Sequence, residues 1–592
     1  MGLRGGKRQG NIPHRSVFKH YGCIYGRWAE AKHGAASKTS DFVMKRHLAI
    51  AALAASFVFF LISSSTLAAQ HHHGAEGGDA DATIERFGAV HMPISCASNV
   101  QVPFERGVAL MHSFWYEEAR RQFQAIAATD SQCAMARWGL AMTEWRPFWD
   151  GMPDDRRKAG ILEIDKATVL KAKSDRESRY IAALSGYLHA DPARNKEALS
   201  AYAGVMGLLH GAYPEDVEAT AFYGLALAAN IGAQDPVGDA RKALAVLEPG
   251  FDAHPDHPGF AHYIIHTCDT PQLAREALPA AERYAAIAPS SAHALHMPGH
   301  IFARLGMWQQ DVDSNEASMR ASALAETRHQ SGVTHELHAA EFLLYAYLQQ
   351  ADDANVKRVL DSTEPMATHL RSIPDLASDG MAPFITYVEV EFPGIYDLEM
   401  HDWKAALAIP SPPNSIVSTK YMRAWVQAIA AGHLRDAAAA DKATAAAEQF
   451  ADATAKEGSP IGLEIAVTQG TIKAWQSFAH KEDARALQQI SAAADLQDRA
   501  GQAEVDIPAR EMYADMLVTD NRPAEALTQY CTALKLSPNR FNALYNAGIA
   551  AEAAGRPDEA TMYYRQLMKI TSDGAHSQRP ELTHARDFLS KK

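Results

Sequence analysis

Four histidines with regular spacing are the residues of this chain that could do chemistry together. His262 and His266 stand four positions apart, and so do His296 and His300. Residues four apart lie on one face of a helix, so each pair can present two imidazoles to the same side. Neutral imidazole is a ligand for zinc, copper and nickel, and such a pair supplies two of the nitrogens that one ion needs. The two pairs therefore predict a transition-metal site.

Residues close to these pairs refine the expected chemistry. Glu341 could add a ligand or orient a histidine from behind. Pro298, between His296 and His300, predicts either a helix reshaped at that point or a helix that begins there. His262-Tyr-Ile-Ile-His266 has the spacing of the HExxH motif but lacks its glutamate. We therefore assign no catalytic residue and do not favour an enzyme, although a metal carrier or a metal-dependent hydrolase remains the alternative function.

Helices must position these residues. The second histidine pair follows the first by 34 residues, and the chain is rich in alanine and poor in strand-like alternation. Two consecutive 34-residue units at 507–574 repeat small and large residues at fixed positions. With Ile507 as position 1, the residues at positions 8, 20 and 24 are Ala514, Ala526 and Tyr530, then Gly548, Ala560 and Tyr564.

These units resemble the tetratricopeptide repeat (TPR) superfamily. The stretch HALHMPGHIFARLG also resembles a group of exported bacterial TPR proteins that share an HMPxHIFxRLG-type motif. The resemblance implies an all-α fold, a solenoid of helix–turn–helix repeats in one segment or two. It also implies that the first helix of each repeat lines a concave groove.

Carried onto this chain position by position, the resemblance predicts a set of groove residues apart from the metal candidates. They are His112, Trp145, Arg146, His293, Arg304, His338 and Tyr345. Such a groove is expected to bind a partner protein, a peptide or a small ligand, and this scaffold function is the favoured interpretation. A site for Zn, Cu or Ni at His262, His266, His296, His300 and Glu341 is the second, and purely structural histidines are the third.

The first 68 residues differ from the rest of the chain. Met44-Lys45-Arg46, an apolar run over 48–62 and a small-residue exit have the pattern of a secretory signal peptide, with an uncleaved anchor as the alternative. We expect a periplasmic protein, or a secreted one, without a membrane span after cleavage. Residues 1–68 hold ten Lys and Arg and two acidic residues, so 47 basic and 68 acidic side chains follow. This acidic body excludes a nucleic-acid surface.

An exported chain can form disulfides. Cys96 precedes the first helix of an expected hairpin and Cys133 follows the second, so the antiparallel helices bring the two cysteines together. We expect a Cys96–Cys133 bridge.

These observations divide the chain into eight segments. They are a non-native extension (1–43), a signal peptide (44–68), a His/Gly-rich linker (69–95), an N-terminal solenoid with the histidine-rich groove (96–360), an irregular Pro-rich repeat or joint (361–420), helical repeats (421–506), two regular TPR repeats (507–574) and a C-terminal tail (575–592).

Overall fold

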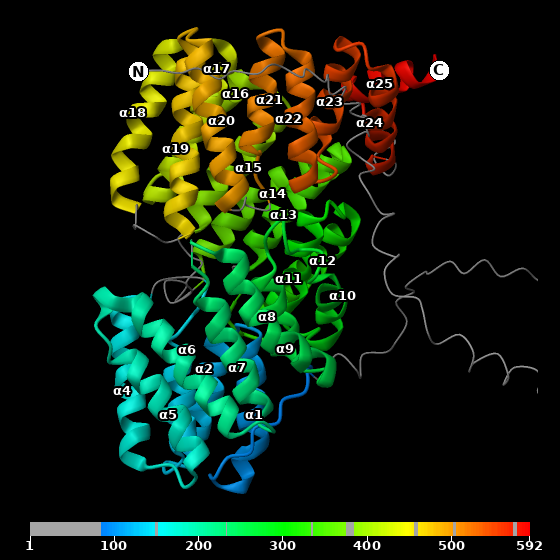
Figure 1. The fold of residues 1–592 in the computed structure, drawn as a ribbon. Coiled ribbons are helices and arrows are strands. Elements are labelled where there is room, and N and C mark those ends of the chain that lie inside the picture. Colours follow the sequence, from blue (N-terminus) through cyan, green and yellow to red (C-terminus); the bar gives the residue numbers. More distant parts are fainter. Residues whose placement is uncertain are drawn as a thin grey trace, which may run out of the picture. The chain divides into compact units, whose positions relative to one another are not determined.

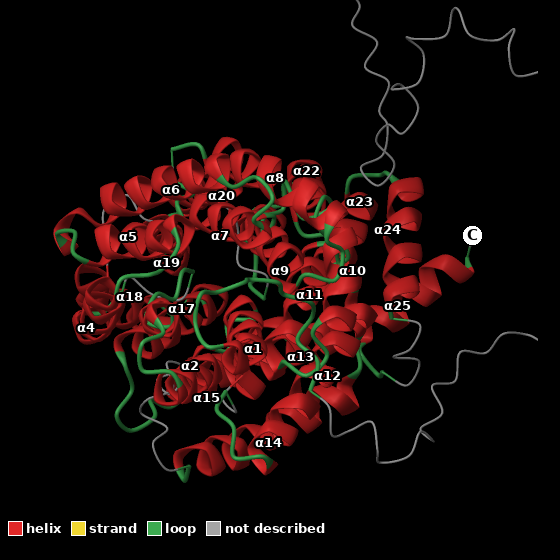
Figure 2. Cartoon of the chain, turned by 90° about the horizontal axis from the view of Figure 1, so that it is seen from below, coloured by secondary structure: helices red, strands yellow, loops and turns green. Residues whose placement is uncertain are grey.

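The computed structural model of the chain describes residues 85–148, 152–232, 234–332, 335–373, 384–454, 460–500, 505–571 and 577–591. The expected extension, the signal peptide and the first part of the linker lie outside these residues. Residues from Glu85 onward belong to one compact unit, so the chain does not divide at 361–420. Within the described ranges there are helices and no strands (Figure 2). None of the described helices is long and apolar enough to span a membrane.

The N-terminal part consists of eight α-helices and two short 3-10 helices (Figure 1). They are η1 (Ser98–Val100), α1 (Gln101–His112), α2 (Tyr116–Thr129), α3 (Ala134–Met142), α4 (Asp154–Leu170), α5 (Asp175–Leu188), η2 (Pro192–Arg194), α6 (Asn195–Ala212), α7 (Val217–Ala229) and α8 (Pro236–Ala253). Gly107 allows α1 and α2 to pack closely in the first hairpin, because a Cβ there would lie 2.8 Å from the ring of Phe123 on α2.

The middle of the chain carries the histidine pairs. Its helices are α9 (Pro258–Thr267), α10 (Leu278–Ile287), α11 (Ala292–Arg304), α12 (Trp308–Thr327), α13 (His335–Gln350) and α14 (Asp353–Arg371). Each hairpin packs on the next, and the first helices α9, α11 and α13 also contact one another in succession. This is the arrangement that the 34-residue period predicts.

The C-terminal part continues the same pattern. Its helices are α15 (Phe384–Glu399), α16 (Trp403–Ala408), α17 (Val417–Leu434), α18 (Ala437–Thr454), α19 (Pro460–Ala479), α20 (Asp483–Ala500), α21 (Ala509–Thr519), α22 (Pro523–Leu536), α23 (Phe541–Ala553), α24 (Pro557–Ile570) and α25 (Pro580–Ser590). Helices α21 to α24 form the two regular repeats. A Cβ on Gly548 would clash with the ring of Tyr564, which explains the small and large residues at positions 8 and 24. The all-α solenoid of TPR-like repeats is thus confirmed.

Three segment assignments need correction. Residues 85–95 are not a linker, because Phe87 and Met92 are buried in the core. Residues 575–592 are not a tail, because α25 packs on α24 and buries Leu582. The Pro-rich stretch is mostly helical where it is described, since Pro365 and Pro393 lie inside α14 and α15 instead of ending them.

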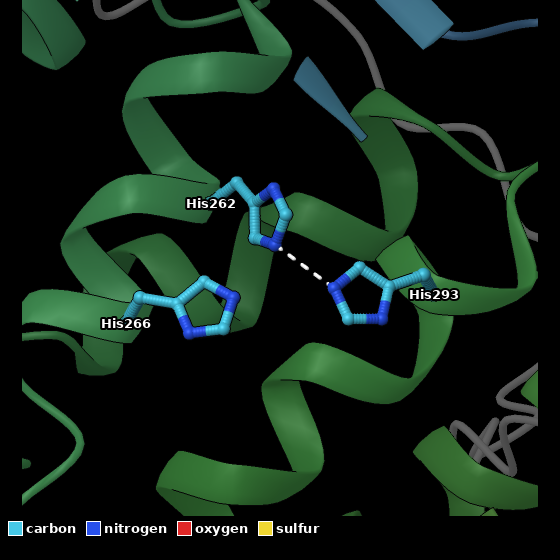
Figure 3. Close-up of side chains that lie close together, drawn as sticks. All are labelled: His262, His266 and His293. Carbon is cyan, nitrogen blue, oxygen red and sulfur yellow. Dashed lines mark hydrogen bonds between the residues drawn. The ribbon is translucent and has the colours of Figure 1, made fainter. Parts of the chain in front are cut away.

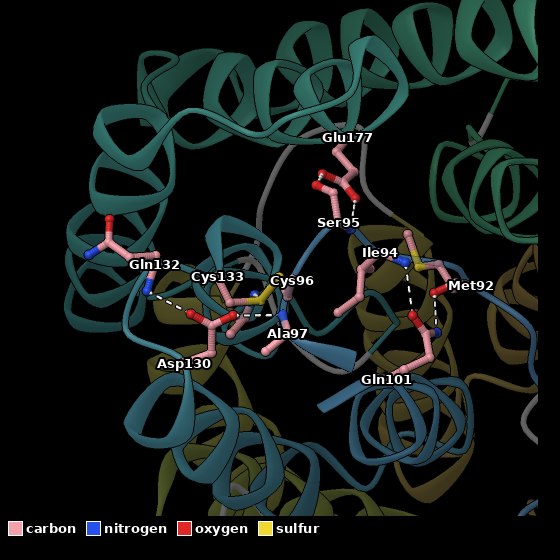
Figure 4. The surroundings of a disulfide bond; sticks show 11 residues. Met92, Ile94, Ser95, Cys96, Ala97, Gln101, Asp130, Gln132, Cys133 and Glu177 are labelled. Atoms are coloured by element: carbon pink, nitrogen blue, oxygen red, sulfur yellow. Dashed lines mark hydrogen bonds between the residues drawn. A yellow bond between two sulfur atoms is a disulfide. The ribbon is translucent and has the colours of Figure 1, made fainter. Parts of the chain in front are cut away.

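The structure joins Cys96 to Cys133 by a disulfide, with the two Cα atoms 5.0 Å apart. Asp130 accepts hydrogen bonds from the backbone N–H groups of Ala97 (2.8 Å) and Gln132 (3.1 Å) beside it (Figure 4). The bridge and Asp130 together fasten the segment before α1 to the end of α2.

Candidate metal centre

The first helices of three successive repeats bring six histidines together. His262 and His266 come from α9, three more from α11 and His338 from α13. Helix α9 begins at Pro258, which suits the first helical position, and the side chain of Ser291 caps α11 by accepting from the N–H of Ala294. These starts set the register that turns the i, i+4 pairs inward.

The first cluster consists of His262, His266 and His293 (Figure 3). One nitrogen from each ring lies within 4.8 Å of the other two. The Nε2 atoms of His262 and His293 are 3.1 Å apart, and the Nδ1 of His262 donates to the backbone carbonyl of His112 at 2.6 Å. Burial and the neighbouring imidazoles hold the pKa values of His262 and His293 well below the usual range. Both rings are therefore neutral, as a metal ligand must be.

Two phenylalanines cover this first cluster. The ring of Phe114 lies 4.2 Å from that of His262, centroid to centroid, and it stacks on His266 and His293. Phe148 stacks almost parallel on His266, with ring centroids 4.5 Å apart. Phe114 is fully buried, whereas Phe148 is 41% exposed. The aromatic cover lowers the local dielectric constant and limits the access of water to the imidazoles.

The second cluster consists of His296, His300 and His338. The Nε2 atoms of His296 and His300 are 2.9 Å apart. All three Nδ1 atoms donate to an oxygen: His296 to Asn315 (2.6 Å), His300 to Asp269 (2.8 Å) and His338 to Glu341 (2.7 Å). A hydrogen-bonded Nδ1 fixes the tautomer that leaves Nε2 as the free ligand atom, which is the usual support of a metal-bound histidine.

The two clusters adjoin along α11. The ring centroids of His293 and His296 are 6.2 Å apart, and those of His266 and His300 are 6.5 Å apart. Each cluster offers three imidazole nitrogens, the number of protein ligands typical of a catalytic zinc site. The six histidines thus form two neighbouring candidate metal sites.

Glycine 299 lets α11 approach the support of the second cluster. A Cβ at this position would lie 2.7 Å from Nδ2 of Asn315 and 2.8 Å from Oδ1 of Asp311. The Asn315 amide donates to the carbonyl (2.9 Å) and to the carboxylate (2.7 Å) of Asp311, and this contact turns its Oδ1 toward His296. Asp311 occupies a repeat position where alanine is usual. The buried carboxylate of Asp311 orients Asn315, and Asn315 in turn orients His296.

A buried carboxylate supports the first cluster indirectly, through His112. Glu218, on α7, accepts from Nε2 of His112 at 2.6 Å and from Nε2 of His257 at 3.0 Å. The other nitrogen of His112 lies 2.7 Å from the hydroxyl of Tyr263. Although burial alone would raise it, the two histidines hold the pKa of Glu218 far below its usual value. This network fixes α1, whose His112 carbonyl orients His262.

Several residues that were predicted to line an open groove lie elsewhere in the structure. His112, Trp145 and Tyr345 are buried in the core, so the prediction is wrong for these three. Arg146 pairs with Glu117 at 2.9 Å, and Arg304 pairs with Asp269 at 2.9 Å. Both guanidinium groups therefore have carboxylate partners within the fold instead of facing an open groove.

The predicted metal ligands also regroup. The sequence placed the four paired histidines in one layer, whereas the structure divides them into two clusters. His293 and His338, expected in the groove, each complete one cluster. Glu341 accepts a hydrogen bond from His338, and its role toward a metal ion stays a prediction. Asp269 and Asn315 were not predicted, and no spacing rule points to them.

Comparisons with known proteins give distant similarities to solved structures and no family. No protein-family model matches the chain, and no curated protein matches it. Among solved structures, the human IFIT1 dimer with m7Gppp-AAAA shares 13% identity over 74% of this chain and 90% of its own, with a TM-score of 0.36. The Naa15/Naa10 complex bound to HypK-THB shares 11% identity over 83% and 91%, with a TM-score of 0.22. The TPR domain of P58(IPK) shares 16% identity over 64% and 99%, with a TM-score of 0.19.

Proposed function

We propose that this chain is an exported protein that binds two transition-metal ions, one in each three-histidine cluster. One observation carries the proposal: in the second cluster, all three Nδ1 atoms have oxygen acceptors, and one nitrogen of each ring lies within 4.8 Å of the other two. Histidines that serve only packing have no reason to share this orientation. The partner-binding groove, favoured from sequence, stays a prediction.

The charge around the clusters favours copper in its monovalent state. All six ligands are imidazoles, which bring no negative charge to the site. Among the carboxylates behind them, Asp269 is paired with Arg304, and Glu218 is shared by His112 and His257. Glu341 and Asp311 accept hydrogen bonds from His338 and Asn315. Two divalent ions would bring four positive charges into a largely buried site, whereas two Cu(I) ions bring two. Imidazole suits copper as well as zinc and nickel. Among the three metals expected from sequence, this smaller charge supports copper.

Export is supported by two features. The pattern of basic, apolar and small residues over 44–69 is that of a signal peptide. The Cys96–Cys133 disulfide belongs to an oxidising compartment such as the periplasm. Such a location also suits a protein that takes up copper outside the cytoplasm.

Metal analysis of the protein tests the proposal directly. The chain is purified from the periplasm without chelator, and copper, zinc and nickel are measured by mass spectrometry before and after incubation with each salt. We expect two ions per chain, with one lost in His266→Ala and the other in His338→Ala. His369→Ala, at an exposed histidine paired with Glu326, is the matched control and should retain both. A chain that binds no ion after loading, or an equal loss in all three variants, would overturn the proposal.

A further inference from the structure

A cavity of about 370 Å³ extends from the second cluster into the C-terminal repeats. Its walls come mainly from the first helices α13, α15, α17 and α19, which line the concave side of a TPR-type solenoid. Gln497 of α20 and the segment with Val505 and Asp506 complete the lining. His338 and Glu341 belong to this wall and to the second cluster at once. The volume is within the range of pockets that enclose small organic molecules.

The lining of this cavity is acidic. Four carboxyl groups face it, from Glu341, Glu391, Glu464 and Asp506, and no Lys or Arg occurs among the described residues that line it. Burial and the neighbouring Glu341 raise the pKa of Glu391 well above its usual range, and burial raises the pKa of Asp506 to about 7. A cation in the cavity would relieve both effects, since it stabilises the ionised carboxylates.

Glu391 gives an independent sign of a ligand. Its side chain is 96% buried, as only 4% of the residue is exposed, and its Oε2 atom has no hydrogen-bond partner among the described residues. Leaving a buried polar oxygen unsatisfied costs about 1–3 kcal/mol, so a group that binds in the cavity and donates to this oxygen would remove that cost.

Aromatic side chains form the rest of the wall. They are Phe342, Tyr387, Tyr421 and Trp425. The face of an aromatic ring attracts an organic cation and also packs against an apolar body. A bare metal ion would make no use of these rings, and an anion would be repelled by the carboxylates.

We propose that this cavity binds a small organic amine, protonated and with an aromatic body, beside His338 of the second cluster. The ammonium group donates to Oε2 of Glu391, and the aromatic body lies against Tyr421 and Trp425. Amine binding itself depends only on the cavity, whereas its role as the ligand pocket of a metal centre rests on the proposed function.

Three probes of nearly equal shape test the charge requirement: phenethylamine, 2-phenylethanol and phenylacetate. Their binding to the chain as purified is measured by titration calorimetry, with copper, zinc and nickel determined on the same samples. We expect phenethylamine to bind at least tenfold more tightly than the alcohol, and phenylacetate not to bind. Equal affinities for the amine and the alcohol, or no binding of the amine, would overturn the inference.

Matched variants locate the binding site. Glu391→Gln keeps the shape of the side chain but removes its charge, and it should weaken phenethylamine at least tenfold. Glu364→Gln, at an exposed glutamate of α14 outside the cavity, should leave affinity unchanged. An unchanged affinity in Glu391→Gln, with thermal unfolding showing a folded protein, would overturn the inference. Metal without amine binding contradicts this inference alone, whereas amine binding without metal contradicts the proposed function alone.

Discussion

Substitution of Gly299 by alanine tests whether the hydrogen bonds behind the second cluster matter for metal binding. The new Cβ would lie 2.7 Å from Nδ2 of Asn315. An ordinary contact needs 3.4 Å or more, so the amide has to move by about 0.7 Å. The hydrogen bond from His296 to Oδ1 of Asn315 is now 2.6 Å long, and a shift of that size takes it to the limit of hydrogen-bond geometry.

Loss of an orienting contact of this kind typically costs about 10- to 100-fold in metal affinity. We therefore expect Gly299→Ala to bind the ion of the second cluster about 10- to 100-fold more weakly, which corresponds to about 1.4–2.7 kcal/mol. The ion of the first cluster should be unaffected, because His262 is oriented by a carbonyl of α1. The measurement is a competition between the protein and a chromophoric chelator for Cu(I), which resolves the two binding steps.

The matched control is Gly186→Ala, also in a helix. A Cβ at Gly186 meets no atom within 4 Å, so this change should leave metal binding intact and stabilise α5 by about 0.5–1 kcal/mol. If the second cluster of Gly299→Ala binds Cu(I) as tightly as that of the wild type, the orienting role of Asn315 is refuted.

Three further predictions concern stability. In the metal-free protein, burial lowers the pKa of His262, His293 and His296, so only the unfolded state takes up protons at these histidines below about pH 6.5. The free energy of unfolding should therefore fall below that pH by about 1.4 kcal/mol per histidine and pH unit. Urea titrations between about pH 5 and 8 check this, and a stability that does not change with pH would contradict it. Cys96→Ser opens a loop that the disulfide closes across 37 positions, and the added entropy of the unfolded chain should lower the free energy of unfolding by about 4 kcal/mol. Cys133→Ser should lower it by the same amount, and the double variant should lose no more than either single variant. Arg540→Leu leaves Glu399 and Glu511 buried without their shared cation and should cost about 3–5 kcal/mol in urea denaturation. A loss below about 1 kcal/mol would contradict this prediction.

The sequence predicts the helical scaffold well because its information is local. A 34-residue spacing and the small residues at Ala514 and Gly548 need only neighbouring hairpins to take effect. The division of the histidines into two clusters depends on how far successive first helices are offset, and no local pattern contains that offset. His338 was recognised as a groove residue, but its place beside His296 follows from the packing of α13 on α11.

The residues that hydrogen-bond to the cluster histidines were harder to predict than the histidines themselves. Asp269 lies in the turn after α9, and Asn315 lies on α12, so each reaches a histidine from a different element. One signal was present: Asp311 replaces the expected alanine at a buried repeat position. A charged residue where the repeat needs a small apolar one is retained at a cost, and such a departure indicates a polar network nearby.

The C-terminal repeats pack back on the helices that carry the histidines, and this changes how the chain must fold. The indole N–H of Trp308 donates to the carbonyl of Asn539 at 2.8 Å, and the Asn539 amide donates to the carbonyl of Gly306 at 2.9 Å. Phe541 adds a contact from its backbone N–H to Gln349. An ordinary repeat array contacts only its neighbours and can nucleate anywhere. Here three hydrogen bonds join residues more than 190 positions apart, which raises the contact order. The array therefore completes its fold only after synthesis reaches the last repeats. It does so slowly, as a single cooperative body.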